Sequence, residues 1–287
     1  MIIKTKILIS VKRLFFVSLL LLLFISAQSQ REFFIPKALI IPVHTHKQEL
    51  HVSLGLGGGY DGNISYALTK HFAVFTTGNL NTGTAKRVSF FGDKFKIHKN
   101  DYAVKGGIGY YSATKHKLVN YIESYAGYGK YKVDNFWYLP DEKETSGYDT
   151  KARFWNVFWQ INATHKIHKQ EFTTALRITY SKYTDLQYRD RYPNAHDLKN
   201  TLEGLRGVTI DPVVSYSYLL NKCKFNLQAG VAVFLNSVKV DVVHYQMYAN
   251  QIIVSKDPGI TKVSAGAAIG RLSVEYNFDF RKKNKRG

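Results

Sequence analysis

The sequence predicts an all-β fold, an antiparallel up-and-down β-barrel of about ten strands that spans a membrane. Apolar and polar residues alternate with a period of two in stretches of about ten residues, the length that a tilted strand needs to cross a bilayer. Short and long connections follow one another between these stretches. The aromatic share is 14%, and aromatic side chains favour strands because they pack well on a pleated surface.

The final stretch shows the alternation most clearly. From residue 272 to residue 280, every even-numbered residue is apolar and every odd-numbered residue is polar. One face of this strand is therefore apolar, and we expect it to face the membrane. The residues of this terminal membrane-facing strand are Leu272, Val274, Tyr276, Phe278 and Phe280.

Nine earlier stretches alternate in a similar way, although the fifth, residues 118–132, changes its alternation partway. A β-bulge would explain that change, because it adds one unpaired residue to a strand. The sixth stretch carries Phe154 and Phe158 among its polar residues. The first apolar residues of the nine stretches are Leu50, Ile64, Phe72, Tyr102, Leu118, Trp155, Phe172, Ile210 and Phe225.

The connections support the same fold, because membrane barrels alternate short periplasmic turns with long outer loops. Gly57–Gly59 is the one short connection that interrupts the alternation of short turns and long loops. An alternating segment within residues 236–258 would raise the count from ten strands to twelve if it formed a hairpin. The short connections are residues 69–71, 113–117, 166–170 and 220–222. The long connections are residues 81–100, 133–150, 184–207 and 236–258.

The first 27 residues have the pattern of a signal peptide. Residues 1–13 contain basic side chains and no acidic one, and the following segment, Leu14–Phe24, is almost wholly apolar. Small residues follow at Ser26 and Ala27, as a signal peptidase requires. The apolar run is shorter than the roughly 20 residues that a transmembrane helix needs. We therefore expect cleavage between residues 27 and 30, and export of the mature chain.

The sequence divides into four regions. Residues 1–27 are the expected signal peptide, and residues 28–47 are an irregular N-terminal arm that enters or plugs the barrel. Residues 48–280 form the β-barrel, and residues 281–287 form a basic tail.

The chain resembles the outer-membrane protein β-barrel family, the small bacterial barrels of eight to twelve strands. The resemblance rests on the leader, the strand–turn–strand unit Tyr66–Phe75 and the terminal strand that ends at Phe280, and it covers nearly the whole mature chain. It implies a fold and a place in the bacterial outer membrane, not an activity. In such barrels the terminal aromatic residue commonly ends the chain and helps the insertion machinery to recognise it. Here residues 281–287 follow, which we interpret as a solvated periplasmic extension.

The formal net charge of +19 indicates an anionic partner but does not identify it. Such a surplus attracts any polyanion, whether nucleic acid, lipid headgroup or acidic polysaccharide. Export, the scattered basic residues and the lack of a recognition-helix pattern argue against nucleic acid. The partners that we expect are outer-membrane lipid, an anionic surface glycolipid and the barrel-insertion machinery.

Four charged residues fall on the polar face opposite the apolar stripe, and both signs are present among them. In a membrane barrel this face points into the lumen, where charges of opposite sign should pair. In a barrel of ten strands such a network fills the interior more readily than it lines a wide pore, since roomy channels need about 16 strands. The residues of this predicted lumen charge network are Lys105, Arg177, Asp211 and Glu275.

Three histidines, His44, His46 and His51, lie close together in the sequence, and imidazole is a common metal ligand. Two precede the first strand and no carboxylate spacing completes a site, so we expect incidental surface histidines, with no metal or cofactor.

Some barrels of this size are hydrolases with a site at the outer rim. Here the candidate pairs are Asp241 with His244, and His196 with Asp197. Neither pair has a third partner that the sequence reveals, and a catalytic pair is judged first on geometry. We therefore expect no enzymatic activity.

The favoured hypothesis is a membrane barrel with a structural, surface-binding or narrow-pore role. Two alternative hypotheses remain. One is a soluble periplasmic barrel resembling a lipocalin, with the apolar face turned inward around a ligand. The other is a rim protease or lipid hydrolase. Alternation does not separate a membrane barrel from an inverted soluble one. The unequal connections, the aromatic terminal strand and the mixed charges favour the membrane.

Overall fold

The computed structural model describes most of the region expected to form the barrel and part of the arm before it. Its described residues contain no helix that is long and apolar enough to cross a membrane. The expected signal peptide and basic tail, and the arm before residue 39, lie outside the described residues. The described ranges are residues 39–88, 94–138, 147–190, 197–235, 238–248, 251–261 and 267–280.

The described residues form thirteen β-strands that belong to one antiparallel sheet. These strands are β1 (Glu49–Leu56), β2 (Tyr60–Ala67), β3 (Phe72–Val88), β4 (Lys94–His116), β5 (Val119–Tyr138), β6 (Tyr148–Ile167), β7 (Gln170–Asp190), β8 (Asp197–Glu203), β9 (Arg206–Leu220), β10 (Cys223–Phe234), β11 (Val238–Tyr248), β12 (Gln251–Thr261) and β13 (Ala267–Asp279).

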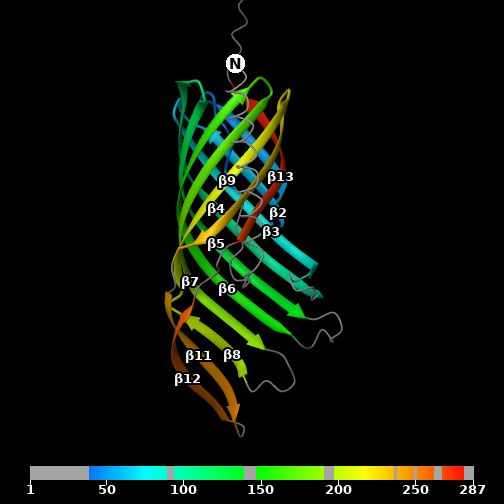
Figure 1. The fold of residues 1–287 in the computed structure, drawn as a ribbon, viewed down its shortest axis with the longest axis vertical. Coiled ribbons are helices and arrows are strands. Elements are labelled where there is room, and N and C mark those ends of the chain that lie inside the picture. Colours follow the sequence, from blue (N-terminus) through cyan, green and yellow to red (C-terminus); the bar gives the residue numbers. More distant parts are fainter. Residues whose placement is uncertain are drawn as a thin grey trace, which may run out of the picture.

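Ten of the strands close into a barrel, as Figure 1 shows, which confirms the predicted fold class and count. Around the wall the order is β1, β2, β3, β4, β5, β6, β7, β9, β10 and β13. Pairing of β13 with β1, from Glu49 opposite Asp279 to Leu56 opposite Leu272, closes the ring. A closed ring leaves no strand edge unpaired, which a chain in lipid requires.

The strand connections are short at one end of the barrel, which we call the turn end. There β2 joins β3, β4 joins β5, β6 joins β7 and β9 joins β10 within a few residues, at the places where the sequence predicts short turns. The opposite end, which we call the extended end, carries the longer strands.

The predicted long loops are wrong over much of their length. Strand β3 continues to Val88 and β4 begins at Lys94, so most of residues 81–100 is paired strand. Strand β4 has 23 residues, more than twice the roughly ten that cross a bilayer. Polar composition does not end a strand, because hairpin partners continue to satisfy each other's backbone groups.

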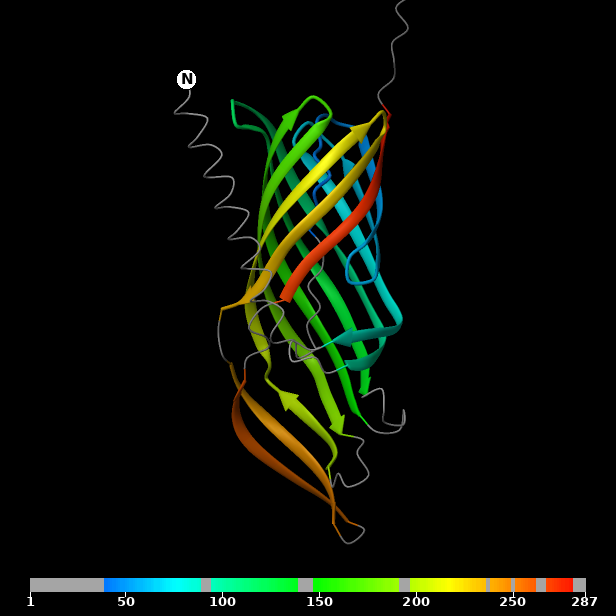
Figure 2. The same ribbon diagram turned by 45° about the vertical axis from the view of Figure 1, so that its right-hand side comes forward.

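Strands β8, β11 and β12 lie outside the barrel and extend its wall from the end of β7 (Figure 2). We call this extension the outer sheet. The hairpin suggested within residues 236–258 does form and continues to Thr261, because β11 pairs with β12 from Val238 opposite Thr261 to Tyr248 opposite Gln251. It joins the outer sheet through β8, so the barrel keeps ten strands.

The barrel is apolar outside and largely polar inside. Leu54, Val104 and Leu227 are each more than half exposed on the outer wall, while Ser65, Asn162 and other polar residues are fully buried. A soluble ligand-binding barrel has the reverse arrangement, so the lipocalin-like alternative is excluded. The structure places the predicted terminal face on the outer wall, with all five side chains exposed: Leu272, Val274, Tyr276, Phe278 and Phe280.

Strand β5 has no change of face along its length, contrary to the sequence interpretation. From Glu123 to Asn135 its odd-numbered residues, such as Tyr125 and Tyr131, point inward and are buried or part-buried. The register shift lies beside the turn, between Ala113 and His116 of β4. The alternation is obscured because aromatic side chains occupy the inward face, as Phe158 does on β6.

The outer wall gives a first test. Val274 lies opposite Leu54 of β1 and Phe225 of β10, and all three side chains are exposed. We expect Val274→Lys to lower the free energy of unfolding in vesicles by about 2–4 kcal/mol, because it places an ammonium in hydrocarbon. Urea titration followed by tryptophan fluorescence measures this, with Val274→Leu as the control. A loss within about 0.5 kcal/mol, typical of solvent-exposed sites, would contradict a lipid-facing Val274.

Candidate functional site: the filled lumen

Residues 39–47, the described part of the arm, run without strand structure into the lumen. The side chains of Leu39 to His44 are buried. A backbone that has no strand neighbour must find other hydrogen-bond partners when it is buried. The lumen wall supplies them.

Amide side chains of the wall hold the start of this segment. The Gln228 side chain accepts from the Leu39 amide at 3.1 Å and donates to the Leu39 carbonyl at 3.2 Å. Gln160 and Asn162 both donate to the Ile40 carbonyl, at 2.6 and 3.0 Å. These bonds join the arm to β10 and β6 at once.

Charged side chains hold the remainder. The Lys224 ammonium donates to the Pro42 carbonyl at 2.9 Å and lies 3.4 Å from the Ile41 carbonyl. The Glu123 carboxylate accepts from the His44 amide at 3.0 Å. The arm is therefore bound through its backbone by side chains from β5, β6 and β10.

Apolar packing fills the lumen beside these polar contacts. Leu39, Ile41 and Val43 belong to a buried cluster that includes Tyr131 and Phe154, whose stacked rings lie 4.6 Å apart. A cavity of about 20 Å³ remains beside Leu39 and Ile40, which is close to the space of a single water. Between the described arm residues and the described wall, buried side chains therefore occupy the lumen around Leu39 to His44.

The structure divides the predicted charge network into separate contacts. Arg177 of β7 and Asp211 of β9 are directly opposite each other and form a buried ion pair at 2.8 Å. Removing one partner of such a pair costs about 3–5 kcal/mol. The Lys105 ammonium and the Arg177 guanidinium each lie 5.9 Å from the ring centre of Phe158, so the aromatic ring links them.

Glu275, the fourth predicted residue, lies elsewhere and has partners that the sequence analysis missed. Its carboxylate is 2.7 Å from the Lys224 ammonium and 2.7 Å from His51 Nδ1. Lys224 alternates with Asn226 and Gln228 on the polar face of β10, which is the signal that would have found it. Glu123 was hidden by the aromatic inward face of β5.

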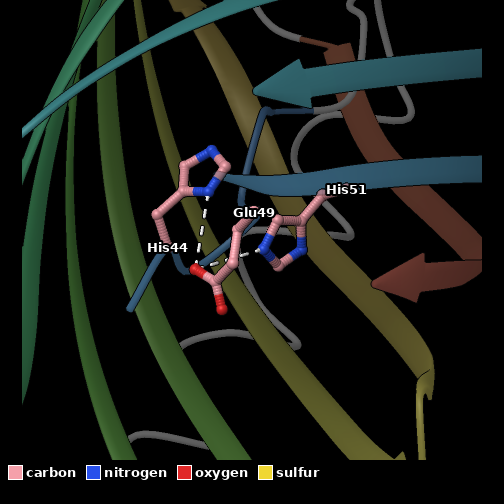
Figure 3. Close-up of side chains that lie close together, drawn as sticks. All are labelled: His44, Glu49 and His51. Carbon is pink, nitrogen blue, oxygen red and sulfur yellow. Dashed lines mark ion pairs between the residues drawn. The ribbon is translucent and has the colours of Figure 1, made fainter. Parts of the chain in front are cut away.

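The expectation of incidental surface histidines is wrong for His44 and His51, whose exposures are 0% and 3%. His44 is buried because the arm turns into the lumen, and His51 because the polar face of β1 lines it. His46 is part-exposed at the turn end, with its ring 3.1 Å from Glu49. Figure 3 shows His44 and His51 on either side of the Glu49 carboxylate.

A second group of residues lies on the outer wall, towards the extended end. The register places Lys130 of β5 beside Trp155, Trp155 beside Lys182 of β7, and Lys182 beside Arg206 of β9. Lys132 lies directly opposite Arg153. We call these five cations the basic patch: Lys130, Lys132, Arg153, Lys182 and Arg206. Sequence reasoning missed it because strand register is needed to see it.

The fold, but not the sequence, matches known proteins. Neither a protein-family model nor a curated protein sequence matches the chain. The outer-membrane protease OmpT of Escherichia coli superposes with a TM-score of 0.54 and 11% identity, over 81% of this chain and 94% of that protein. The chain has the fold of the outer-membrane β-barrel proteins. At this identity the match concerns the fold alone.

Other solved outer-membrane barrels align with this barrel at lower scores. The translocator domain of the autotransporter NalP of Neisseria meningitidis has 12% identity and a TM-score of 0.40, over 80% of this chain and 87% of that one. A major outer-membrane protein of Thermus thermophilus has 12% identity and a TM-score of 0.39, over 80% and 99%.

The apolar wall and the fold place this chain in the bacterial outer membrane. In such barrels the short turns face the periplasm and the longer connections face outward. The buried histidines therefore lie near the periplasmic end, and the basic patch and outer sheet lie on the external side.

The rim residues that suggested a hydrolase do not form the expected pairs. Asp241 is 3.1 Å from the Lys256 ammonium, whereas His244 bonds Asn200 at 2.6 Å and lies 3.6 Å from the exposed Asp257. Hydrogen bonds to Glu203 and Asp241 raise the pKa of Lys256 above its usual value, so this lysine remains a cation beside Asp241. His196 and the side chain of Asp197 lie outside the described residues.

The filled lumen gives a prediction about conduction. We expect the native barrel to show no steady single-channel current in a planar bilayer. Replacing Leu39–Val43 by glycine and serine removes the buried apolar side chains, and we expect that variant to conduct. The native barrel in the same lipid is the control, and a stable open level for it would contradict a closed lumen.

Proposed function

We propose that the protein is a closed outer-membrane barrel that binds anionic surface glycolipid through the basic patch. The observation that carries this proposal is the set of five adjacent cations on the outer wall. Arg153 and Lys182 are exposed, as are Lys130 and Arg206, and Lys132 is part-exposed. Their side chains point to where lipid lies, not into the lumen.

Strand register places the carboxylate of Asp185 on β7 opposite Arg153 of the basic patch, but the two form no ion pair in the described part of the chain. None of the five forms an ion pair there. The Lys132 ammonium lies 5.8 Å from the ring centre of Tyr102, and Arg153 is directly opposite Lys132. Like charges facing each other across two strands destabilise the pairing, so an anion bound between them is favourable.

Aromatic side chains mark the depth of the patch. Trp155 stacks on Tyr128 with ring centres 6.2 Å apart and meets Tyr180 at 5.9 Å. Aromatic girdles lie at the boundary between the apolar layer and the headgroups. The basic patch begins in the same row and continues towards the extended end, which is headgroup level in the outer leaflet. Phosphate groups of a surface glycolipid match both that depth and the charge.

A surface role also agrees with the two ends of the molecule. The arm fills the lumen, which supports binding rather than passage of solutes. The outer sheet exposes Ile252, Ile253 and Val254 of β12 beyond the barrel, and this supports a surface that contacts other molecules.

We propose that the barrel has no hydrolase activity. This rests on the separation of the Asp241 and His244 contacts described above. Cleavage of a fluorogenic peptide or of an ester-linked lipid by the purified barrel, at a rate that falls in His244→Ala, would overturn it.

Glycolipid binding is tested by charge removal. We expect the triple variant Lys130→Gln, Arg153→Gln and Lys182→Gln to bind lipid A on the order of 100-fold more weakly, since each basic residue near an anionic surface contributes about 1 kcal/mol. Titration of the barrel with lipid A in neutral detergent, read by native mass spectrometry, measures this.

A matched control removes the same charge from the turn end. Lys115, Lys169 and Lys222 are exposed at three separate hairpins of the turn end, so their replacement by Gln should leave lipid A binding unchanged. An equal loss in both triple variants would mean that net charge alone attracts the glycolipid, and the proposed site would be wrong.

A further inference from the structure

We propose that His44, Glu49 and His51 bind one divalent transition-metal ion, with Zn²⁺ the best fit, at the periplasmic end of the lumen. Each residue directs one ligand atom to a common point, and the three atoms lie within 4.8 Å of one another. Glu49 Oε2 is 3.9 Å from His44 Nδ1 and 3.9 Å from His51 Nε2 (Figure 3).

Hydrogen bonds on the far side of each ring fix which nitrogen is free. His51 Nδ1 lies 2.7 Å from Glu275 Oε1, and because a carboxylate accepts, the ring donates from Nδ1. His44 Nε2 lies 2.7 Å from Ser65 Oγ, whose hydroxyl is 3.4 Å from the Val74 carbonyl. If Ser65 donates to that carbonyl, it accepts from His44. Both neutral rings then keep a lone pair on the nitrogen that faces Glu49.

Those two nitrogens have no hydrogen-bond partner among the described residues. His44 Nδ1 and His51 Nε2 are buried and make no hydrogen bond. Two imidazole lone pairs that face a carboxylate oxygen repel one another when nothing lies between them, and a buried unpaired polar atom is costly. A metal ion at the centre would give both nitrogens a partner.

The surroundings hold the ligands in the way that metal sites require. The contact of Glu275 with His51 is a carboxylate–histidine pair, which orients a ligating ring and raises its basicity. Glu49 accepts from the Thr45 amide at 2.6 Å, from the Thr45 hydroxyl at 2.7 Å and from the His46 amide at 3.1 Å. The carboxylate is therefore fixed by the arm itself.

The charge of this end of the lumen also favours a cation. The buried carboxylates of Glu49, Glu123, Glu171 and Glu275 face two lysines. Lys224 lies 2.7 Å from Glu275 and 3.7 Å from Glu171, and Lys166 lies 3.2 Å from Glu171. Buried charge is stable only when it is compensated. The ion-pair contacts of the Glu49 carboxylate in the described part of the chain are with histidines, so a bound cation beside Glu49 is favourable.

The donor set selects the metal. Two imidazole nitrogens and one carboxylate oxygen suit Zn²⁺, whose bonds to such ligands are about 2.0–2.2 Å. Tetrahedral ligands at that length lie about 3.4 Å apart, so the pairs now at 3.9 Å need only a small inward movement. Because His44 belongs to the arm and the other two belong to β1, the ion would clamp the plug to the wall.

Titration of the chelated, intact barrel in detergent with Zn²⁺ alone tests the site. We expect one ion per chain for the native protein, and a loss of affinity of at least 100-fold in His44→Ala and in His51→Ala. His116→Ala is the matched control, because His116 is exposed at the end of β4, at the same end of the barrel. Heat-modifiable gel mobility shows whether each variant folds.

A second measurement does not depend on the variants. Co²⁺ added to the native barrel should give the strong visible absorption of a tetrahedral site, and excess Zn²⁺ should remove it. Absence of a stoichiometric Zn²⁺ site in the native barrel, or an equal loss of affinity in His116→Ala, would overturn the proposal. In that case His51 is a protonated ring paired with Glu49 and Glu275.

Discussion

The structure depends on one constraint, the pairing of every backbone group that lies in lipid. In the barrel wall, pairing of β13 with β1 closes the ring and satisfies these backbone groups. Outside the bilayer the constraint is relaxed, and there the sheet opens into β8, β11 and β12, with β12 as a free edge. Inside the lumen the same constraint applies to the arm, which has no strand neighbour. Side chains of the wall supply hydrogen bonds to the arm backbone: Gln160, Asn162, Gln228 and Lys224. The need to pair backbone groups thus explains the closed wall, the position of the outer sheet and the hydrogen bonds that hold the arm.

The filled interior agrees with the proposed binding role, and the candidate chemistry of the barrel lies in two places. At the periplasmic end the polar lumen gathers carboxylates and histidines around the end of the arm. On the external wall, cations gather where lipid headgroups lie. The two proposals concern different ligands and different ends, so neither depends on the other. Both depend on the closed wall, because strand register brings Lys182 beside Arg206 and sets Glu275 against His51.

Local patterns in the sequence predicted the features that depend on neighbouring residues alone, namely strands and turns. Period-two alternation gave the terminal strand, and short polar links gave the turns and the count of ten. The long strands were missed because hairpin pairing, not hydrophobicity, carries β3 and β4 past the membrane. The faces of β5 were missed because the arm needs aromatic neighbours, so Tyr125 points inward. The histidine cluster and the basic patch arise from contacts such as His51 with Glu275, 224 residues apart, which no local pattern records.

The length of β4 has a consequence for the height of the molecule. At about 3.4 Å per residue, its 23 residues measure roughly 78 Å, whereas crossing a 30 Å apolar layer at a tilt of about 40° uses roughly 40 Å. Nearly half of the strand therefore stands above the lipid as a rigid paired stalk. The outer sheet starts from that stalk and projects still farther, so its β12 edge lies well above the lipid (Figure 2). A molecule arriving from solution meets this edge first, well before it meets the membrane.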